Sequence, residues 1–207
     1  MFPLPKSDEP GLSPKKPELR SAMLPRVYFP CTRGLAFGSL IGIEGLVVRE
    51  LRGKAKVITR GIHEGAITRI IEASRFSEEG EAAEQGILVS FTNNMFFAED
   101  AGLALAIYDK LLRLKYENSY TAVYAAGHVD PAGKGMISPV KNFDRYCTMV
   151  RELGRQQGLF IFPQVNAAPG KNSADALAAL AERGITCKGI TRLDELPDVL
   201  TEPGNRR

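Results

Sequence analysis

The spacing of apolar residues changes along the chain and separates predicted strands from predicted helices. Short apolar runs bounded by glycine or polar residues predict buried strands, and residues 86–91 (GILVSF) are an example. Apolar residues three and four positions apart predict a helix around Ile67, Ile70 and Ile71. A second helix, predicted over residues 100–114, is apolar nearly all round its first half, which indicates deep burial.

Before residue 86 the pattern predicts an antiparallel opening of about three strands. Two strands, 35–41 and 46–51, are expected on either side of a turn, with a third at 55–59. After residue 114 strands and helices alternate. Together these elements predict an α/β (α+β) protein with a mixed β-sheet and packed helices. The later elements expected are strands at 120–126, 135–140, 159–162 and 186–190, and helices at 142–153, 173–183 and 193–200.

The first thirty-two residues differ in composition from the rest. Seven of the thirteen prolines lie between Pro3 and Pro30, mixed with charged residues. Such a segment buries too little apolar surface to offset the entropy lost on ordering. We therefore expect a Pro-rich flexible arm over residues 1–32, one domain over residues 33–200 and a polar tail over residues 201–207. An arm exposed to solvent is the simpler interpretation, and an arm that lies along the surface of a partner is the alternative.

Composition gives only broad limits on function. The net charge of +3 is small and the basic residues are spread out, so charge alone does not indicate a nucleic-acid-binding protein. Cys31, Cys147 and Cys187 are far apart and lack C-x-x-C spacing, which argues against a disulfide framework and a zinc site. No apolar stretch is long enough for a membrane span, and the N-terminus lacks a signal-peptide pattern. We expect a cytoplasmic protein without metal or cofactor.

Several stretches resemble Lon-type proteins. AGHVDPAGKGMISPV, a predicted amphipathic helix and GLFIFPQVN together resemble the C-terminal half of the Lon protease proteolytic domain. LAFGSLIGIEGLVVREL and ILVSFTNN resemble the corresponding domains of ComM-type, magnesium-chelatase-like helicases, and DAGLALAIYDKL resembles the matching helix of Lon and RadA/Sms helicases. The resemblance covers roughly residues 34–200. It implies the Lon-like fold, a superfold shared with GHMP-type small-molecule kinases and ribosomal RNA-binding domains.

The chain departs from this family at the catalytic pair. Where Lon proteases carry a nucleophilic serine in Pro-Ser-Ala-Gly, this chain reads Glu99-Asp100-Ala101-Gly102. Where they carry lysine, ten positions into Gly-x-x-x-Pro-x-x-x-x-Lys, the count from Gly135 ends at Asp144. In the family the lysine amine is the general base for the serine hydroxyl, and a carboxylate replaces neither group. Each aspartate alone also fits an ordinary role at the start of a helix.

Ser90 and Lys141 are the nearest substitutes for the missing pair. Ser90 lies on a predicted strand ten residues before the expected nucleophile, and Lys141 comes three residues before the expected lysine. The helicase groups retain the Lon-like fold without a working Ser–Lys pair, and this chain is closer to them in chemistry. It lacks the G-x-x-x-x-G-K-[ST] phosphate loop, so no ATPase activity is expected.

Other candidate residues are isolated. His128 with Asp130, and His63 with Glu64, are candidates for a base or a metal ligand, although surface or structural roles are simpler. The glycines around Lys134 suggest a phosphate-binding loop. The resemblance implies a β-hairpin in this segment instead. The apolar residues 95–97 predict either an exposed patch for a partner or a loop folded over the core.

We therefore expect a stand-alone, degenerate Lon-like domain that acts as a non-catalytic binding or assembly module. The expected partners are copies of itself, a separate ATPase or, weakly and without sequence specificity, nucleic acid; no membrane is expected. The alternative is an enzyme: a Lon-type serine peptidase with a relocated dyad of Ser90 and Lys141, or an activity that uses Asp100 and Asp144. The fold alone does not decide between these classes.

Overall fold

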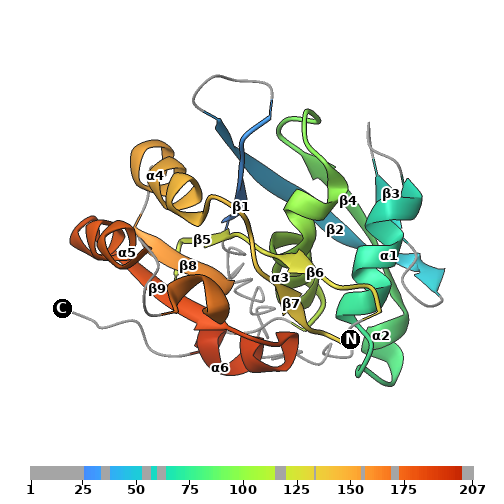
Figure 1. Ribbon diagram of the computed structural model, residues 1–207. Coiled ribbons are helices and arrows are strands. Elements are labelled where there is room, and N and C mark those ends of the chain that lie inside the picture. Colours follow the sequence, from blue (N-terminus) through green and yellow to red (C-terminus); the bar gives the residue numbers. More distant parts are fainter. Residues whose placement is uncertain are drawn as a thin grey trace, which may run out of the picture.

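The computed structural model describes residues 26–33, 38–52, 57–59, 64–114, 120–132, 134–154, 157–168 and 173–201. These residues form a mixed β-sheet with helices packed on both faces (Figure 1). The predicted α/β class with a mixed sheet is therefore confirmed. No helix in these ranges combines the length and the apolar character needed to cross a membrane.

All strands of the main sheet except one run in the same direction. The strand order is β3-β4-β2-β1-β5-β8-β9, and β2 is antiparallel to both of its neighbours. Every other neighbouring pair is parallel, so the carboxyl ends of these strands meet at one edge. The strands are β1 (Arg26–Cys31), β2 (Ser39–Arg52), β3 (Val57–Thr59), β4 (Gln85–Phe91), β5 (Ala122–Ala125), β8 (Gly158–Pro163) and β9 (Ile185–Ile190), and a separate antiparallel pair is formed by β6 (His128–Val129) and β7 (Ile137–Ser138).

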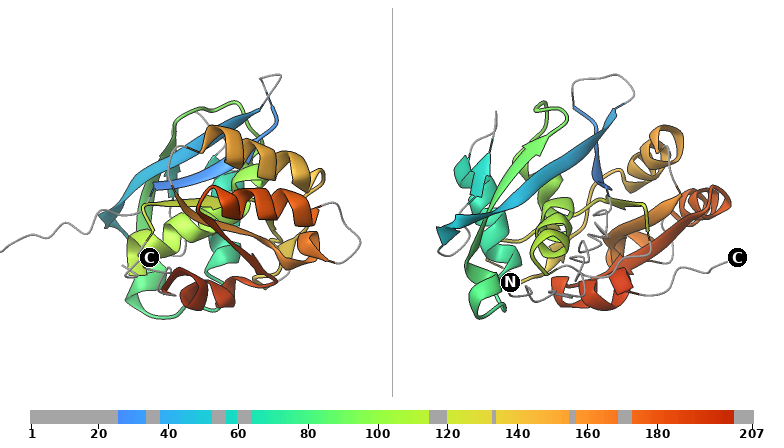
Figure 2. Two further views of the ribbon diagram at one scale, coloured as in Figure 1. Left: turned by 90° about the vertical axis from the view of Figure 1, so that its left-hand side faces the viewer. Right: turned by 180° about the vertical axis from the view of Figure 1, so that it is seen from behind.

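Helices form one layer on each face of the sheet, and the two layers bury two apolar clusters (Figure 2). Val123 of β5 belongs to the cluster with α1, α3 and α6, whereas the next residue, Tyr124, belongs to the cluster with α4 and α5. Central strands buried on both sides read as continuous apolar runs for this reason. The helices are α1 (Glu64–Ser74), α2 (Glu81–Glu84), α3 (Gly102–Leu114), α4 (Phe143–Leu153), α5 (Ser173–Glu182) and α6 (Leu196–Thr201), with short 3₁₀ turns η1 (Ala98–Ala101), η2 (Gln164–Ala167) and η3 (Leu193–Glu195).

A buried network of charges joins α1, α2, β4 and α3. Asp109 of α3 is fully buried and accepts hydrogen bonds from Arg75, at 3.0 Å from its Nε, and from Arg113, at 2.9 Å from its Nε. Arg75 also donates to the carbonyls of Ala83 and Gln85, at 3.0 and 2.8 Å. The two guanidinium groups compensate the carboxylate and also satisfy backbone carbonyls of the neighbouring segments, which a buried charge requires.

The predicted arm is wrong over residues 26–31, which form β1 in the middle of the sheet. Val27, Phe29 and Cys31 are fully buried, with 0% exposure, so this part of the proline-rich segment has a strand's alternation. Pro30 is tolerated because the pairing of β1 with β5 covers only Arg26 to Tyr28, which leaves that side of the strand open at residue 30. Residues 1–25 and 202–207 lie outside the described residues, and residue 201 ends α6 rather than beginning the tail.

The predicted turn at residues 42–45 is also wrong, because β2 runs without interruption from Ser39 to Arg52. Gly45 serves close packing here: a Cβ atom at this position would lie 2.1 Å from the carbonyl oxygen of Leu88 on β4. β3 is parallel to β4, so the opening is not wholly antiparallel. The helix at Ile67 to Ile71, the buried α3 and the strand at 86–91 are confirmed. The alternation after residue 114 is confirmed, with 135–140 reduced to the short strand β7.

Removing the buried carboxylate should destabilise the fold strongly. Asp109→Ala leaves the buried guanidinium group of Arg75 without a carboxylate partner and leaves that of Arg113 with Glu78 alone, and we expect a loss of about 3–5 kcal/mol in the free energy of unfolding. Urea titration with a constant m-value measures it. Glu152→Ala, in the exposed pair with Arg151, is the matched control and should change stability by less than about 0.5 kcal/mol. Equal losses in both variants would contradict the role given to Asp109.

Candidate functional site

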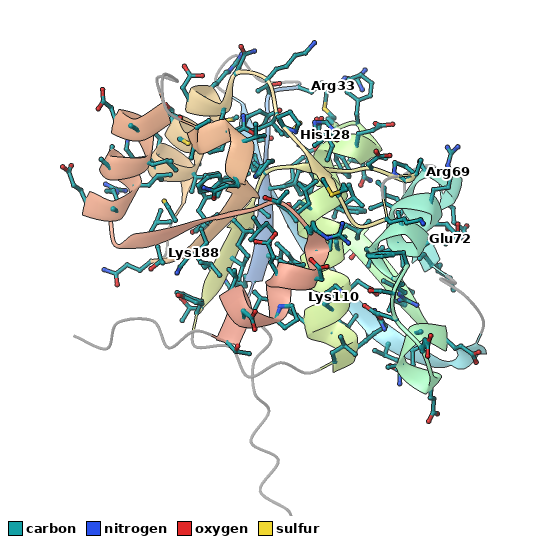
Figure 3. All side chains as sticks on the ribbon, turned by 60° about the horizontal axis from the view of Figure 1, so that its bottom comes forward. Arg33, Arg69, Glu72, Lys110, His128 and Lys188 are labelled. Carbon is teal, nitrogen blue, oxygen red and sulfur yellow. The ribbon has the colours of Figure 1, made fainter. Side chains whose placement is uncertain are left out.

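Three loops that follow parallel strands meet at the carboxyl edge of the sheet. The loop after β1 contains Thr32 and Arg33, the loop after β4 leads through residues 92–97 into η1, and β5 leads directly to His128. The chain after β4 continues into α3 on one face of the sheet, whereas the chain after β5 continues through β6 and β7 into α4 on the other. In open α/β sheets ligands bind outside the carboxyl ends of the strands. Figure 3 labels Arg33 and His128 at this end of the molecule.

Asp100 lies at the centre of this region, in the 3₁₀ turn that precedes α3. Its Oδ2 accepts a hydrogen bond from the backbone N–H of Phe97 at 3.4 Å, which caps the turn. Burial raises the pKa of Asp100 above its ordinary value, while the Phe97 N–H, His128 and Arg33 act in the opposite direction and Glu99 adds to the rise. Asp100 is therefore a half-buried acid with two cationic or titratable neighbours.

The start of α3 is fixed against the hairpin that carries His128. The backbone N–H of Leu103 donates to the carbonyl of Gly127 at 3.0 Å. Gly102 makes this contact sterically feasible, since a Cβ atom there would lie 2.9 Å from the backbone nitrogen of Val129. Asp100 and His128 are held near one another by backbone packing rather than by a direct side-chain bond.

Tyr146 of α4 and Cys31 of β1 complete the surroundings of Asp100. Burial raises the pKa of the Tyr146 phenol, with further contributions from Asp100 and Cys31, and the phenol also has a hydrogen bond with Thr32. Burial likewise raises the pKa of the Cys31 thiol, whose Sγ donates to the carbonyl of Met95 at 3.6 Å. A buried, protonated thiol is a poor nucleophile, so Cys31 serves packing and loop anchoring.

The loop at residues 95–97 combines the two arrangements that the sequence left open. Phe96 is 6% exposed and packs its ring 4.9 Å from that of Phe29 and 4.8 Å from that of Phe91. Met95 and Phe97 on either side are 58% and 55% exposed. The Met95 N–H donates to the side chain of Asn93 at 2.8 Å, which adds a second anchor. The loop is therefore held by its central residue and presents two apolar side chains to solvent.

The two aspartates of the family comparison have different surroundings. Asp144 lies in the first turn of α4 and is exposed, and its charge acts on Cys147. The charges that act on Asp100 belong to His128, Glu99 and Arg33. Both acids have the helix-start position that the sequence suggested, but within the described ranges no hydrogen bond or ion pair joins them. This geometry therefore does not support an activity that uses Asp100 and Asp144 together.

Ser90 and Lys141 do not form a dyad in the described part of the chain. Ser90 lies on β4 and pairs with Glu44 of β2, and Lys141 is exposed in the turn before α4. The residue that fixes this turn is Asn166, which is buried in η2. Its side chain accepts a hydrogen bond from the Val140 N–H at 3.1 Å and donates to the Val140 carbonyl at 2.8 Å. Asn166 thereby fixes the backbone of Val140 shortly before the start of α4.

The segment around Lys134 is a hairpin, as the resemblance implies. β6 and β7 are antiparallel, and the Asp130 side chain accepts a hydrogen bond from the Ala132 N–H at 2.9 Å within the turn. Lys134 is exposed, and His63 lies outside the described residues. Among the side chains that the structure describes, no group of three or more histidine, cysteine, aspartate or glutamate residues is placed to hold a metal ion.

Asp100 and His128 were candidates from the sequence, but other neighbours of Asp100 were not. Thr32 and Cys31 fell within the predicted arm, and Tyr146 lies in a predicted helix without any signal of a site. Only their position could have indicated that these residues belong to the site, because each lies at, follows or faces the end of a parallel strand. A scan against models of known protein families finds no match, and a search of curated proteins finds none.

The charge of Asp100 should oppose folding at neutral pH. Because burial raises its pKa, the folded state holds the proton more tightly than the unfolded state, so the destabilisation is absent below the unfolded pKa and complete above the folded pKa. Asp100→Asn keeps an acceptor oxygen for Phe97. We expect its Tm to exceed that of the wild type by a few degrees at about pH 7 and the difference to disappear near about pH 4.

Asp144→Asn is the matched control, because it removes an exposed carboxylate from the first turn of α4. Loss of the favourable interaction with the helix dipole should lower stability slightly, by about 0.3–1 kcal/mol, so the sign is opposite. Thermal unfolding followed by circular dichroism over a pH series measures both variants. A lower Tm for Asp100→Asn at neutral pH would mean that its charge stabilises the fold.

Proposed function

We propose that this chain is a stand-alone, degenerate Lon-like domain that binds or assembles with a protein partner and does not hydrolyse peptides. The observation that carries the proposal is the half-buried Asp100 at the position of the family's nucleophile, tied to the backbone of Phe97 and bordered by a fixed loop with two exposed apolar side chains. An acid in that place supplies a charge for recognition but no hydroxyl for attack.

The order and placement of elements support the Lon-like assignment. The buried helix α3 begins directly after the loop that follows β4, and the hairpin of β6 and β7 leads into α4, as the resemblance implies. The stretch GLFIFPQVN forms β8 and η2, and its Asn166 fastens the turn before α4. These features support the fold proposal, while function requires the argument from the site itself.

The surroundings of Asp100 favour binding over hydrolysis. A Lon-type mechanism needs a desolvated lysine amine within reach of a hydroxyl. In the described residues Lys141 is exposed and has no hydrogen bond to Ser90. The thiol of Cys31 is buried and donates to a carbonyl, so it is not offered to a substrate either.

The exposed pair Met95 and Phe97 favours a protein partner over nucleic acid. Apolar side chains held on an anchored loop lose little conformational entropy when they are buried against a partner, and aromatic residues are frequent anchors of interfaces. Glu99 and Asp100 lie next to this pair and would repel phosphates. A second copy of the chain and a separate ATPase are the partners that the proposal puts first, and weak, salt-sensitive nucleic-acid binding comes second.

The wild type should show no peptidase turnover above the uncatalysed rate. The test compares wild type, Ser90→Ala and Lys141→Ala on a quenched fluorescent peptide library at equal protein concentration, with a refolding control for each variant. Three identical background rates are expected, because no nucleophile and base are assembled at the site. Turnover by the wild type that is lost in both variants would overturn the proposal and establish the relocated dyad.

Self-association, if a second copy is the partner, should depend on the exposed pair. Sedimentation velocity at increasing concentration compares the wild type with Met95→Ser/Phe97→Ser. The substitution should weaken association by about tenfold or more, because it removes two apolar contacts from the interface. The control is Leu153→Ser/Val165→Ser, which alters side chains that are 41% and 48% exposed outside this loop. An equal effect of both variants would exclude a specific role for Met95 and Phe97.

A further inference from the structure

The structural role of Asp100 does not require a charged side chain. As a capping residue it needs only an oxygen that accepts the Phe97 N–H, which asparagine, serine or threonine supplies without a charge. The chain nevertheless has an acid here, in surroundings that disfavour its ionised form. A charged group kept in a partly buried place at the edge of a sheet points to recognition of an opposite charge.

The aromatic ring of Phe97 lies next to this acid. The backbone N–H of Phe97 is bonded to Asp100, and its side chain is more than half exposed. The guanidinium carbon of Arg33 lies 3.9 Å from the centroid of the Phe97 ring, a cation–π contact. The charge of Arg33 also acts on Asp100. The aromatic ring attracts this cation by direct contact, and the carboxylate attracts it through its charge without an ion pair.

The guanidinium group of Arg33 indicates which chemical group fits beside the Phe97 ring. Arg33 itself is held there weakly. It is exposed, and among the described residues its side chain makes the ring contact but no ion pair. An exposed cation–π contact contributes about 0.5–1 kcal/mol, which corresponds to about a two- to fivefold disadvantage for a competing cation. A second guanidinium or ammonium group can therefore displace Arg33 at small free-energy cost.

We propose that the position between Asp100 and the Phe97 ring binds the guanidinium or ammonium group of a partner's arginine or lysine side chain, and that Arg33 occupies this position until the partner binds. The inference rests on the proposed function, because it names the chemistry that the partner presents to this surface. Met95, exposed two residues before Phe97, is placed to contact apolar atoms of the partner next to the basic side chain. His128 borders the carboxylate from the hairpin.

The test uses the full chain and a defined probe, N-acetylarginine amide, titrated to tens of millimolar and followed by ¹⁵N chemical shifts. Arg33→Ala should bind the probe about two- to fivefold more tightly than the wild type, because the internal competitor is gone. In the Arg33→Ala background, Asp100→Asn and Phe97→Leu should each weaken binding of the probe severalfold relative to Arg33→Ala alone. N-acetylglutamine amide, which is neutral, should bind to none of these proteins.

Two controls make a negative result informative. Arg151→Ala removes another exposed arginine, at the pair with Glu152, and should leave the affinity for the probe unchanged. Dispersed spectra of each variant establish that it is folded. The proposal is overturned if Arg33→Ala gives no saturable shifts, or if Asp100→Asn leaves binding unaltered. Neither result affects the peptidase and self-association assays, so a failed cation site is distinguishable from a failed binding module.

Discussion

The buried carboxylate of Asp109 is the constraint on which the placement of α3 depends. A fully buried charge is tolerated only when it is compensated, and here Arg75 and Arg113 both donate to it. Arg75 comes directly after α1 and also donates to the carbonyls of Ala83 in α2 and Gln85 in β4, so one charge cluster connects α1, α2, α3 and the start of β4. Glu78 supplies a second carboxylate, which forms ion pairs with Lys110 and Arg113. Helix α3 is consequently anchored at its carboxyl-terminal half.

That anchor has a consequence at the opposite end of the same helix. An α-helix has about 3.6 residues per turn, so the fixed position of Asp109 lies about two turns from the start of α3 at Gly102. There the contact between Leu103 and Gly127 holds the helix against the hairpin and brings Asp100 beside His128. Figure 3 shows the separation, with Lys110 toward one end of α3 and Arg33 and His128 near the other. The structural charges and the candidate site are thus two ends of one rigid element.

The sequence predicted what depends on local pattern and missed what depends on distant partners. The burial of α3 and the position of Asp100 at its start follow from an apolar run with an acid before it. The strand at 26–31 was not predicted because prolines dominate the surrounding segment. The packing role of Gly45 could not be predicted because it depends on Leu88, which lies opposite on β4. The pairing of Arg75 with Asp109 joins residues 34 positions apart, so no local pattern announces it. For the same reason Tyr146 and Cys31 could not be assigned to the site.

The two groups of charges differ in a way that bears on function. Around Asp109 the carboxylate accepts bonds from two guanidinium groups that are themselves buried, and such a network serves the fold. Around Asp100 compensation is incomplete: one backbone N–H is bonded, and the positive charge of Arg33 acts from an exposed side chain that forms no ion pair with it among the described residues. A fold that needed only stability would have paired Asp100 fully or replaced it with a neutral cap. The charge of Asp100 is therefore incompletely compensated at the carboxyl edge of the sheet, beside an exposed aromatic ring. A cationic group from another molecule can supply the missing compensation.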